Sequence, residues 1–260
     1  MRLNGSRVLI TGASAGIGAA LAAELRGRGA RLALAGRDEH RLRAAARGAW
    51  MLAGDLTEAD YRERLFEGAC AHFGGLDILI NNAGVGLYAA PSVSRLEQTR
   101  AMFELNFFAA VDLAQRACAV MRPQGCGMIV NISSIAGRVT LPWFTLYSAS
   151  KFALTSFTEG LRAELAGTGV RAMVVSPGYV QTGFQDHVLA GAPPEPLRRA
   201  RRIATSAEAC ARAVARGIQQ DKDEVVTPWS GRVLVWAARW WPGLVAWQLE
   251  RMNRSLDGQQ

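Results

Sequence analysis

The sequence predicts an α/β fold in which seven strands form one doubly wound, mostly parallel sheet with helices on both faces. Short apolar runs alternate with helix-length segments from the start of the chain to about residue 227, and this alternation implies right-handed crossovers between parallel strands. A glycine-rich turn separates the first apolar run from the first helical segment. We expect one main domain over residues 1–228 with a lid insertion at 183–205, followed by a helical extension at 229–260.

The expected elements alternate regularly along the chain. The strand-like runs are residues 7–11, 31–35, 50–53, 77–81, 128–132, 170–175 and 224–227. The segments long enough to form helices are residues 16–28, 38–46, 58–73, 95–121, 144–166 and 206–219. The insertion at 183–205 is rich in proline and arginine, carries His187, and interrupts the alternation before the last of these helices.

The composition is that of a globular protein with a single core. Of 260 residues, 50% are hydrophobic and 20% charged, and one domain of this length buries enough surface to fold without a metal or disulfide. The net charge of +8 comes almost wholly from arginines spread along the chain, with no basic stripe typical of nucleic-acid binding. The four cysteines form no C-x-x-C pair, so we expect no zinc site, no disulfide framework and a cytoplasmic protein.

The glycine-rich turn predicts a phosphate-binding loop. Glycines allow a sharp turn and a close approach to a pyrophosphate, while the following helix presents its free N–H groups and positive dipole end. The position between strand and helix is the context that this function requires. The expected cofactor contacts here are Gly12, Ser14, Ala15, Gly16, Ile17 and Gly18.

The end of the second strand favours NADP(H) over NAD(H). An acidic residue at this point would bind the ribose 2′-hydroxyl of NAD, but the chain has Gly36 followed by Arg37. A guanidinium suits a 2′-phosphate, which an acid would repel. Asp38 is expected to cap the next helix, although a shift of this loop would permit NAD(H).

Tyr147 and Lys151 form a candidate proton-transfer pair. They lie four residues apart in an expected helix, so their side chains share one face. An ammonium group beside a phenol stabilises the phenolate and lowers a pKa that starts near ~10. The phenol is then able to exchange a proton with an alcohol or a carbonyl near neutral pH.

Several further motifs follow one another along the chain, and Ser134 lies 13 residues before Tyr147. They are Asp55-Leu56, Asn81-Asn82-Ala83-Gly84, Asn106, Ser134, Tyr147-x-x-x-Lys151, Pro177-Gly178 and Thr182. With the glycine turn, these motifs make residues 7 to about 227 resemble a short-chain dehydrogenase/reductase. The resemblance implies a Rossmann-type catalytic domain and an NAD(P)-dependent oxidoreductase.

The resemblance also implies roles for individual residues. Tyr147 would be the acid or base and Lys151 would tune it while holding the nicotinamide ribose. Ser134 would hydrogen-bond the reacting oxygen, with Ser133 as the competing candidate, and Asn106 would hold a water that links the lysine to solvent.

Other matching positions are implied to hold the cofactor. Asp55 would bind the adenine and Leu56 would line it, and the Asn82-Ala83-Gly84 turn would pack over the adenosine ribose. The loop behind the nicotinamide would consist of Pro177, Gly178, Val180 and Thr182. Many NADP-linked members have a basic residue before the middle glycine of the first motif, where this chain has Ala15, so the 2′-phosphate would depend mainly on Arg37.

The expected substrate pocket is largely apolar and contains no convergent acid. It favours a lipophilic ketone, aldehyde or alcohol beneath a lid formed by the insertion. The residues assigned to its wall are Leu87, Trp143, Phe144, Tyr179 and Phe184.

The C-terminal extension holds five of the seven tryptophans within nineteen residues. It is too interrupted by charge to span a membrane. Its helices either pack on the domain or on another subunit, or contact a membrane surface through tryptophan and arginine. The resemblance implies a homodimer or homotetramer through the helices expected at 95–121 and 144–166. The rival hypotheses are a non-catalytic dinucleotide-sensing protein and a membrane-surface scaffold on the same fold.

Overall fold

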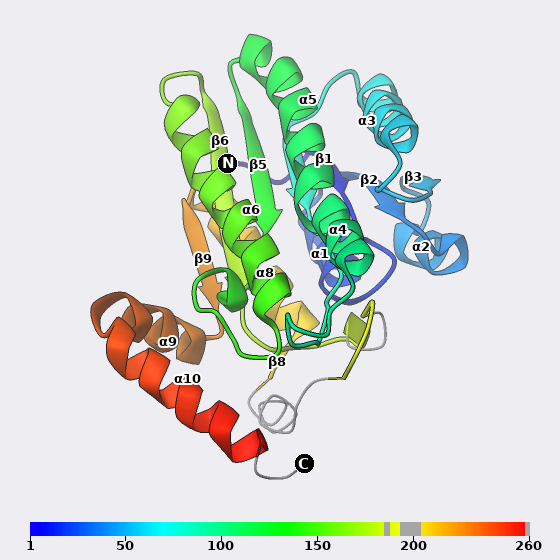
Figure 1. The fold of residues 1–260 in the computed structure, drawn as a ribbon. Helices are drawn as coiled ribbons and strands as arrows, with labels where there is room; N and C mark the ends of the chain where they lie inside the picture. Colours follow the sequence, from blue (N-terminus) through cyan, green and yellow to red (C-terminus); the bar gives the residue numbers. More distant parts are fainter. Residues whose placement is uncertain (185–187, 193–203, 258–260) are drawn as a thin grey trace.

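A computed structural model describes residues 1–184, 188–192 and 204–257. Most of the insertion expected at 183–205, including His187 and the arginines at 198, 199, 201 and 202, lies outside these residues. The described chain contains a central sheet with helices on both faces (Figure 1), which confirms the predicted fold class.

The sheet has seven strands in the order β3-β2-β1-β4-β5-β6-β9, and every pairing is parallel. The strands are β1 (Arg7–Ile10), β2 (Arg31–Gly36), β3 (Trp50–Ala53), β4 (Ile78–Asn81), β5 (Gly127–Ile132), β6 (Val170–Pro177) and β9 (Glu224–Thr227). The chain builds outward from β1 to β3 and then crosses back to β4 on the other side of β1. This reversal leaves a crevice at the carboxyl ends of β1 and β4, where doubly wound sheets bind ligands.

Two apolar cores cover the two faces of the sheet. One face packs against α1 (Gly16–Gly27), α2 (Glu39–Ala46) and α8 (Ala207–Gln219). The other packs against α3 (Ala59–Phe73), α5 (Ala109–Gln124) and α6 (Thr145–Glu164). Alternate β4 residues serve each core: Ile78 and Ile80 face the first, and Leu79 faces the second. A central parallel strand is buried on both faces of the sheet, and its sequence is therefore apolar at almost every position.

The long helix expected at 95–121 is not uniform. It consists of α4 (Leu96–Phe103), a π-helical turn at Glu104–Phe108, and α5, which extends beyond the expected end. Two short strands, β7 (Val180–Gln181) and β8 (Thr205–Ser206), also form a parallel pair that the sequence did not predict.

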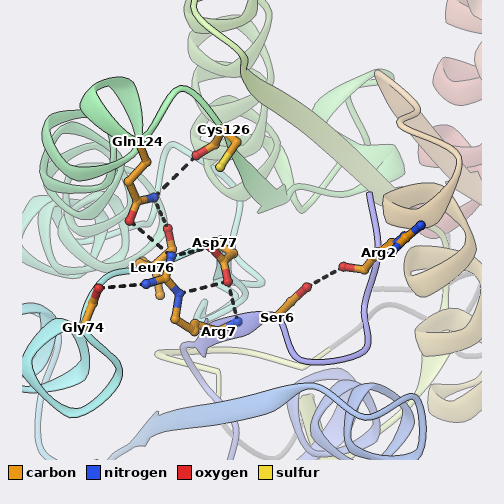
Figure 2. Close-up of polar contacts among 8 residues, drawn as sticks. All are labelled: Arg2, Ser6, Arg7, Gly74, Leu76, Asp77, Gln124 and Cys126. Carbon is orange, nitrogen blue, oxygen red and sulfur yellow. Dashed lines mark hydrogen bonds and ion pairs between the residues drawn. The ribbon is translucent and has the colours of Figure 1, made fainter.

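The amino end of the sheet is held by a polar cluster around Arg7 (Figure 2). The Arg7 guanidinium donates to both carboxylate oxygens of Asp77, at 2.6 and 3.0 Å, and to the carbonyl of Gly74 at 2.8 Å. Gln124, at the end of α5, accepts from Arg7 at 3.2 Å and donates to the Leu76 carbonyl at 2.8 Å. The cluster fixes the start of β1 to the segment entering β4.

After β9 the chain forms a helical hairpin, α9 (Trp229–Trp240) and α10 (Pro242–Asp257), which lies past the carboxyl end of β9 (Figure 1). Among the described residues, no helix is long and apolar enough to cross a membrane.

Candidate active site

A cavity of about 590 Å³ opens at the crevice between β1 and β4. It runs from Arg37, after β2, past the glycine turn to Tyr147 on α6, and one side is closed by the start of α9. Residues at or just after the carboxyl ends of all seven strands of the sheet therefore line one elongated space.

The glycine turn is shaped by backbone conformation and close packing. Gly12 and Gly16 have φ angles of +64° and +55°, which favour glycine. A Cβ atom at Gly18 would lie 2.2 Å from the Gly12 carbonyl oxygen, so α1 could not pack this closely on the turn. Asn82 holds the turn from the other side, because its amide donates to the carbonyls of Thr11 and Gly12 at 2.9 and 3.1 Å.

The amino end of α1 is free to bind an anion. Its N-cap residue, Ala15, provides no side-chain cap, and the first turn contains no acidic residue. The unsatisfied N–H groups and the helix dipole favour a phosphate at this point. Ser14, Ala15, Gly16 and Ile17 line the cavity here, so the residues fit the pyrophosphate of a dinucleotide.

Two arginines line the outer end of the cavity, Arg37 and Arg41. Asp38 caps α2, as predicted, by accepting from the Arg41 N–H at 2.9 Å, and it also pairs with the Arg41 guanidinium at 3.2 Å. Sequence analysis missed Arg41, although its place in the first turn of α2, three residues after the predicted cap Asp38, could have indicated it. A Cβ atom at Gly36 would lie 3.1 Å from Ser14, so a larger residue would narrow the cavity there.

Tyr147 lies at the inner end of the cavity, with a relative exposure of 6%. Burial raises the pKa of its phenol, a hydrogen bond with Ser134 acts in the opposite direction, and the neighbouring Tyr88 raises the pKa further. Phe144 stacks on Tyr147 with ring centroids 4.0 Å apart, and Phe184 meets it edge-on at 5.8 Å. The sequence predicted that Lys151 would lower the pKa of Tyr147. In the structure this pKa is instead raised, because desolvation of the phenol outweighs the other effects.

The structure separates the two serine candidates. The Ser133 hydroxyl is buried, donates to the Lys151 carbonyl at 3.0 Å and hydrogen-bonds Thr155 at 2.8 Å, so it fastens β5 to α6. The Ser134 hydroxyl instead lies beside the Tyr147 phenol and also accepts from the Ala136 N–H at 3.1 Å. Both residues line the cavity, but only Ser134 hydrogen-bonds the phenol.

Lys151 and Asn106 face each other across Gly84. The Lys151 ammonium donates to the Ile132 carbonyl at 3.0 Å, and burial lowers its pKa to about 8. Asn106 lies in the π-helical turn, accepts from the Val85 N–H at 2.8 Å and donates to the Val85 carbonyl at 3.0 Å. A Cβ atom at Gly84 would lie 3.1 Å from Asn106 Oδ1 and 3.2 Å from Lys151 Nζ, so glycine keeps this gap open.

The remaining residues expected to hold the cofactor are mostly placed along the cavity. Its lining includes Leu56, Asn82, Ala83, Gly84, Pro177, Gly178, Val180 and Thr182. Asp55 does not line it; its carboxylate accepts from the Thr57 N–H and hydroxyl, both at 2.9 Å. Gly18 and Asn106 also lie outside the lining and act through the residues in front of them.

The expected pocket wall is placed only in part. Phe144, Tyr179 and Phe184 line the cavity. Leu87 and Trp143 do not: Leu87 is fully buried behind the wall, among the residues that pack around Tyr88. The wall also contains residues from the start of the C-terminal hairpin, which sequence analysis did not assign to the pocket: Pro228, Ser230, Gly231 and Leu234.

No group of three or more His, Cys, Asp or Glu side chains that could hold a metal occurs in the described part of the chain.

Comparison with known proteins agrees with this geometry. Residues 6–192 match the family model for short chain dehydrogenase. An uncharacterized oxidoreductase of Staphylococcus saprophyticus is 38% identical over 67% of this chain and 78% of its own length. The 11-beta-hydroxysteroid dehydrogenase 1A of Arabidopsis thaliana is 33% identical over 94% of this chain and 74% of its own.

Solved structures show the same architecture. A short chain dehydrogenase from Burkholderia cenocepacia in complex with NADP superposes with a TM-score of 0.82 and 27% identity, over 96% of this chain and 99% of that one. A short chain dehydrogenase/reductase from Burkholderia phymatum in complex with NAD gives a TM-score of 0.82 with 26% identity, over 92% and 94%.

Proposed function

Because the chain belongs to the short-chain dehydrogenase/reductase family, and is thus an oxidoreductase that uses a nicotinamide dinucleotide, we propose that it interconverts a lipophilic carbonyl compound and its alcohol with NADP(H). The observation that carries this proposal is the Ser134–Tyr147 pair, which is joined by a hydrogen bond at the inner end of the cavity. When bound, the cofactor supplies or accepts a hydride at the nicotinamide ring.

Tyr147 is the proton donor for reduction. Because burial raises the pKa of its phenol, the hydroxyl stays protonated at neutral pH and can donate to the oxygen of a carbonyl as its carbon is reduced. In the reverse direction the same oxygen atom accepts the proton of the alcohol. Ser134 donates to the reacting oxygen and stabilises the negative charge that develops there.

Lys151 and Asn106 support this transfer from behind Tyr147. The ammonium lies 5.8 Å from the centroid of the Tyr147 ring, so its charge favours the phenolate that forms when the proton leaves. Asn106 is a positioning residue, because it fixes the Val85 backbone next to the lysine. As the sequence predicts, we also propose that Asn106 holds a water linked to Lys151.

Two guanidinium groups, one of them paired with Asp38, leave the outer end of the cavity net positive and support the preference for NADP(H). Arg37 and Arg41 both line the outer end of the cavity, and guanidinium groups bind phosphate oxygens in pairs of hydrogen bonds. The Gly36 position carries no carboxylate that would repel the phosphate. Asp38 is engaged in capping α2 and pairing with Arg41, which counts against its binding the ribose of NAD.

The substrate end of the cavity supports a lipophilic substrate. Tyr88, Phe144 and Tyr147 form a stacked column, with Tyr88 and Phe144 at 4.3 Å, and Leu234 adds an apolar wall. One relative is named a hydroxysteroid dehydrogenase. Alicyclic ketones and their alcohols are therefore the first compounds to test.

The decisive experiment is a panel of carbonyls and alcohols, followed by the absorbance of NADPH and, in parallel, NADH. Wild-type protein should turn over with NADPH, and Tyr147→Phe should lose turnover while keeping cofactor binding. Arg37→Glu should weaken NADPH binding by about tenfold or more and leave NADH binding almost unchanged. Undiminished turnover by Tyr147→Phe would overturn the catalytic assignment, and binding of the cofactor without turnover of any compound would favour a dinucleotide sensor.

We also propose that copies of this chain associate as a dimer or tetramer through α4–α6. Phe108, in the π-helical turn, and Phe152, on α6, are 52% and 39% exposed although they are large and apolar. Burial against a second copy would remove this surface from water. Sedimentation velocity of wild type and of Phe108→Asp tests this proposal, since only the wild type should sediment as a dimer or tetramer.

A further inference from the structure

Both helices of the C-terminal hairpin expose large apolar side chains, which together we call the tryptophan face. The fractions exposed are 74% for Trp229, 55% for Trp236, 64% for Trp240, 52% for Trp241 and 53% for Trp247. Val233 and Leu244 extend it at 44% and 62%. Single exposed apolar side chains are common on soluble proteins, but so many within one hairpin are typical of an interaction surface.

The two sides of α9 have different neighbours. Trp229, Val233, Trp236 and Trp240 follow one another at intervals of four, three and four residues, which places them on one stripe of the helix. Roughly the opposite stripe carries Ser230, Gly231 and Leu234, which line the cavity containing Tyr147.

The contact between α9 and the domain is close. A Cβ atom at Gly231 would lie 2.3 Å from Ile135 Cδ1, and the Arg232 guanidinium donates to the Val226 carbonyl at 3.0 Å. The hairpin is thus anchored to the wall of the cavity while its tryptophans point outward.

The charges beside the tryptophan face are mainly positive. Arg232 and Arg239 lie on α9 next to the tryptophan stripe, and on α10 the Arg251 guanidinium lies 5.5 Å from the centre of the Trp247 ring. Through residue 251, Glu250 is the one acidic side chain of the hairpin, which leaves it net positive. A positive surface attracts anionic lipid headgroups.

We propose that the tryptophan face docks this protein on an anionic lipid surface. Tryptophan is enriched at the boundary between hydrocarbon and water, where its ring is buried and its N–H remains hydrated, and arginine reaches from such a helix to the headgroups. Neither helix of the hairpin is able to span a bilayer, so the contact is peripheral. A lipid surface meets both the aromatic and the cationic character of this face.

Docking would bring the cavity to the membrane surface. Because Leu234 lines the cavity from the same helix that carries the tryptophans, the cavity wall lies one helix diameter from the lipid. A compound dissolved in the bilayer would reach the cavity without crossing much water. The docking itself does not depend on the identity of that compound or on the cofactor preference.

The test is co-sedimentation of the full-length protein with vesicles of phosphatidylcholine containing phosphatidylglycerol, and with vesicles of phosphatidylcholine alone. Wild type should pellet with the anionic vesicles and much less with the neutral ones. The double variant Trp240→Ser/Trp247→Ser should bind at least about tenfold more weakly, because two large apolar side chains no longer enter the lipid. Arg239→Gln should weaken binding to anionic vesicles alone.

Matched controls separate docking from general damage. Val93→Ser removes an exposed apolar side chain elsewhere (74% exposed), and Arg64→Gln removes an exposed charge on α3; both should pellet like wild type. Tryptophan emission should shift to shorter wavelength when anionic vesicles are added to wild type, and much less in the double variant. All variants should keep the wild-type melting temperature and turnover of a water-soluble substrate.

Three results would overturn the proposal. The first is wild type that does not pellet with anionic vesicles, and the second is a double variant that pellets as wild type does. The third is a wild-type protein that does not bind vesicles and forms a discrete oligomer, which the double substitution dissociates. The tryptophan face would then join copies of this chain. Tyr147→Phe should pellet like wild type, so failure of the proposed catalysis and failure of docking are distinguishable.

Discussion

Replacing Gly84 by alanine tests whether the gap between Lys151 and Asn106 matters for catalysis. The new Cβ would lie 3.2 Å from Lys151 Nζ and 3.1 Å from Asn106 Oδ1, so one neighbour must move by a few tenths of an ångström. Neither moves freely: Asn106 is 1% exposed and bonded to both polar groups of the Val85 backbone, and Lys151 is 3% exposed and donates to the Ile132 carbonyl.

The cost of this overpacking should be about 1–3 kcal/mol of unfolding free energy. The displaced ammonium or amide should lower kcat by about tenfold, since misplacements of about 1 Å cost roughly 100-fold. The assays are urea denaturation and steady-state kinetics, with the cofactor dissociation constant measured separately.

Gly160→Ala is the matched control, because Gly160 lies on the same helix as Tyr147 and nothing lies within 4 Å of its Cβ position. It should leave kcat unchanged and stabilise the helix by about 0.5–1 kcal/mol. The reasoning is refuted if Gly84→Ala retains wild-type kcat and stability, since the gap would then accommodate a methyl group without consequence.

Three further predictions concern single contacts. Burial acts to raise the pKa of Asp77, but hydrogen bonds and the charge of Arg7 outweigh it and lower that pKa. Asp77→Asn should therefore lower the free energy of unfolding by about 1–3 kcal/mol above pH ~4, and by progressively less as the pH falls through the folded-state pKa. Denaturation at several pH values measures this. A pH-independent cost would contradict this linkage. Ser134→Ala should lower kcat about 10²–10³-fold with little loss of stability, whereas Ser133→Ala should lower stability by about 1–2 kcal/mol and leave most of kcat; the reverse pattern would exchange their roles. Because the pKa of Lys151 is lowered to about 8, the rate of carbonyl reduction should fall as the pH rises through that value, and Lys151→Arg, although slower, should show no such fall if the lysine titration causes it.

The fold was predictable from the sequence because its signals are local and repeated. Runs such as residues 78–81 are apolar at every position, which is what a strand buried on both faces requires. The glycine turn was equally informative, since positive φ angles at Gly12 and Gly16 leave few alternatives to glycine. Asp38 capped its helix as expected because capping depends on neighbouring backbone alone.

The features that sequence reasoning missed depend on contacts between distant segments. The π-helical turn around Asn106 inserts an extra residue into a pattern that otherwise predicts one continuous helix. Leu87 and Trp143 were assigned to the pocket because they are apolar and close in sequence to lining residues, but apolar residues also fill the layer behind a wall. The pKa of Tyr147 depends on desolvation by aromatic rings that come from several elements, so the effect of Lys151 alone did not predict its direction.

The start of α9 shows most clearly why periodicity could not assign the tail. The helix is apolar on two sides, and a single pattern is compatible with packing on the domain, on another subunit or on lipid. One side of the helix packs on the domain, because Gly231 lies against Ile135 and Leu234 lines the cavity. The other side keeps its tryptophans exposed, although the hairpin is already fixed to the domain. Packing on the domain and contact with a membrane, which the sequence presents as alternatives, are therefore compatible on opposite sides of one helix, and the vesicle experiment tests the outer side without disturbing the inner one.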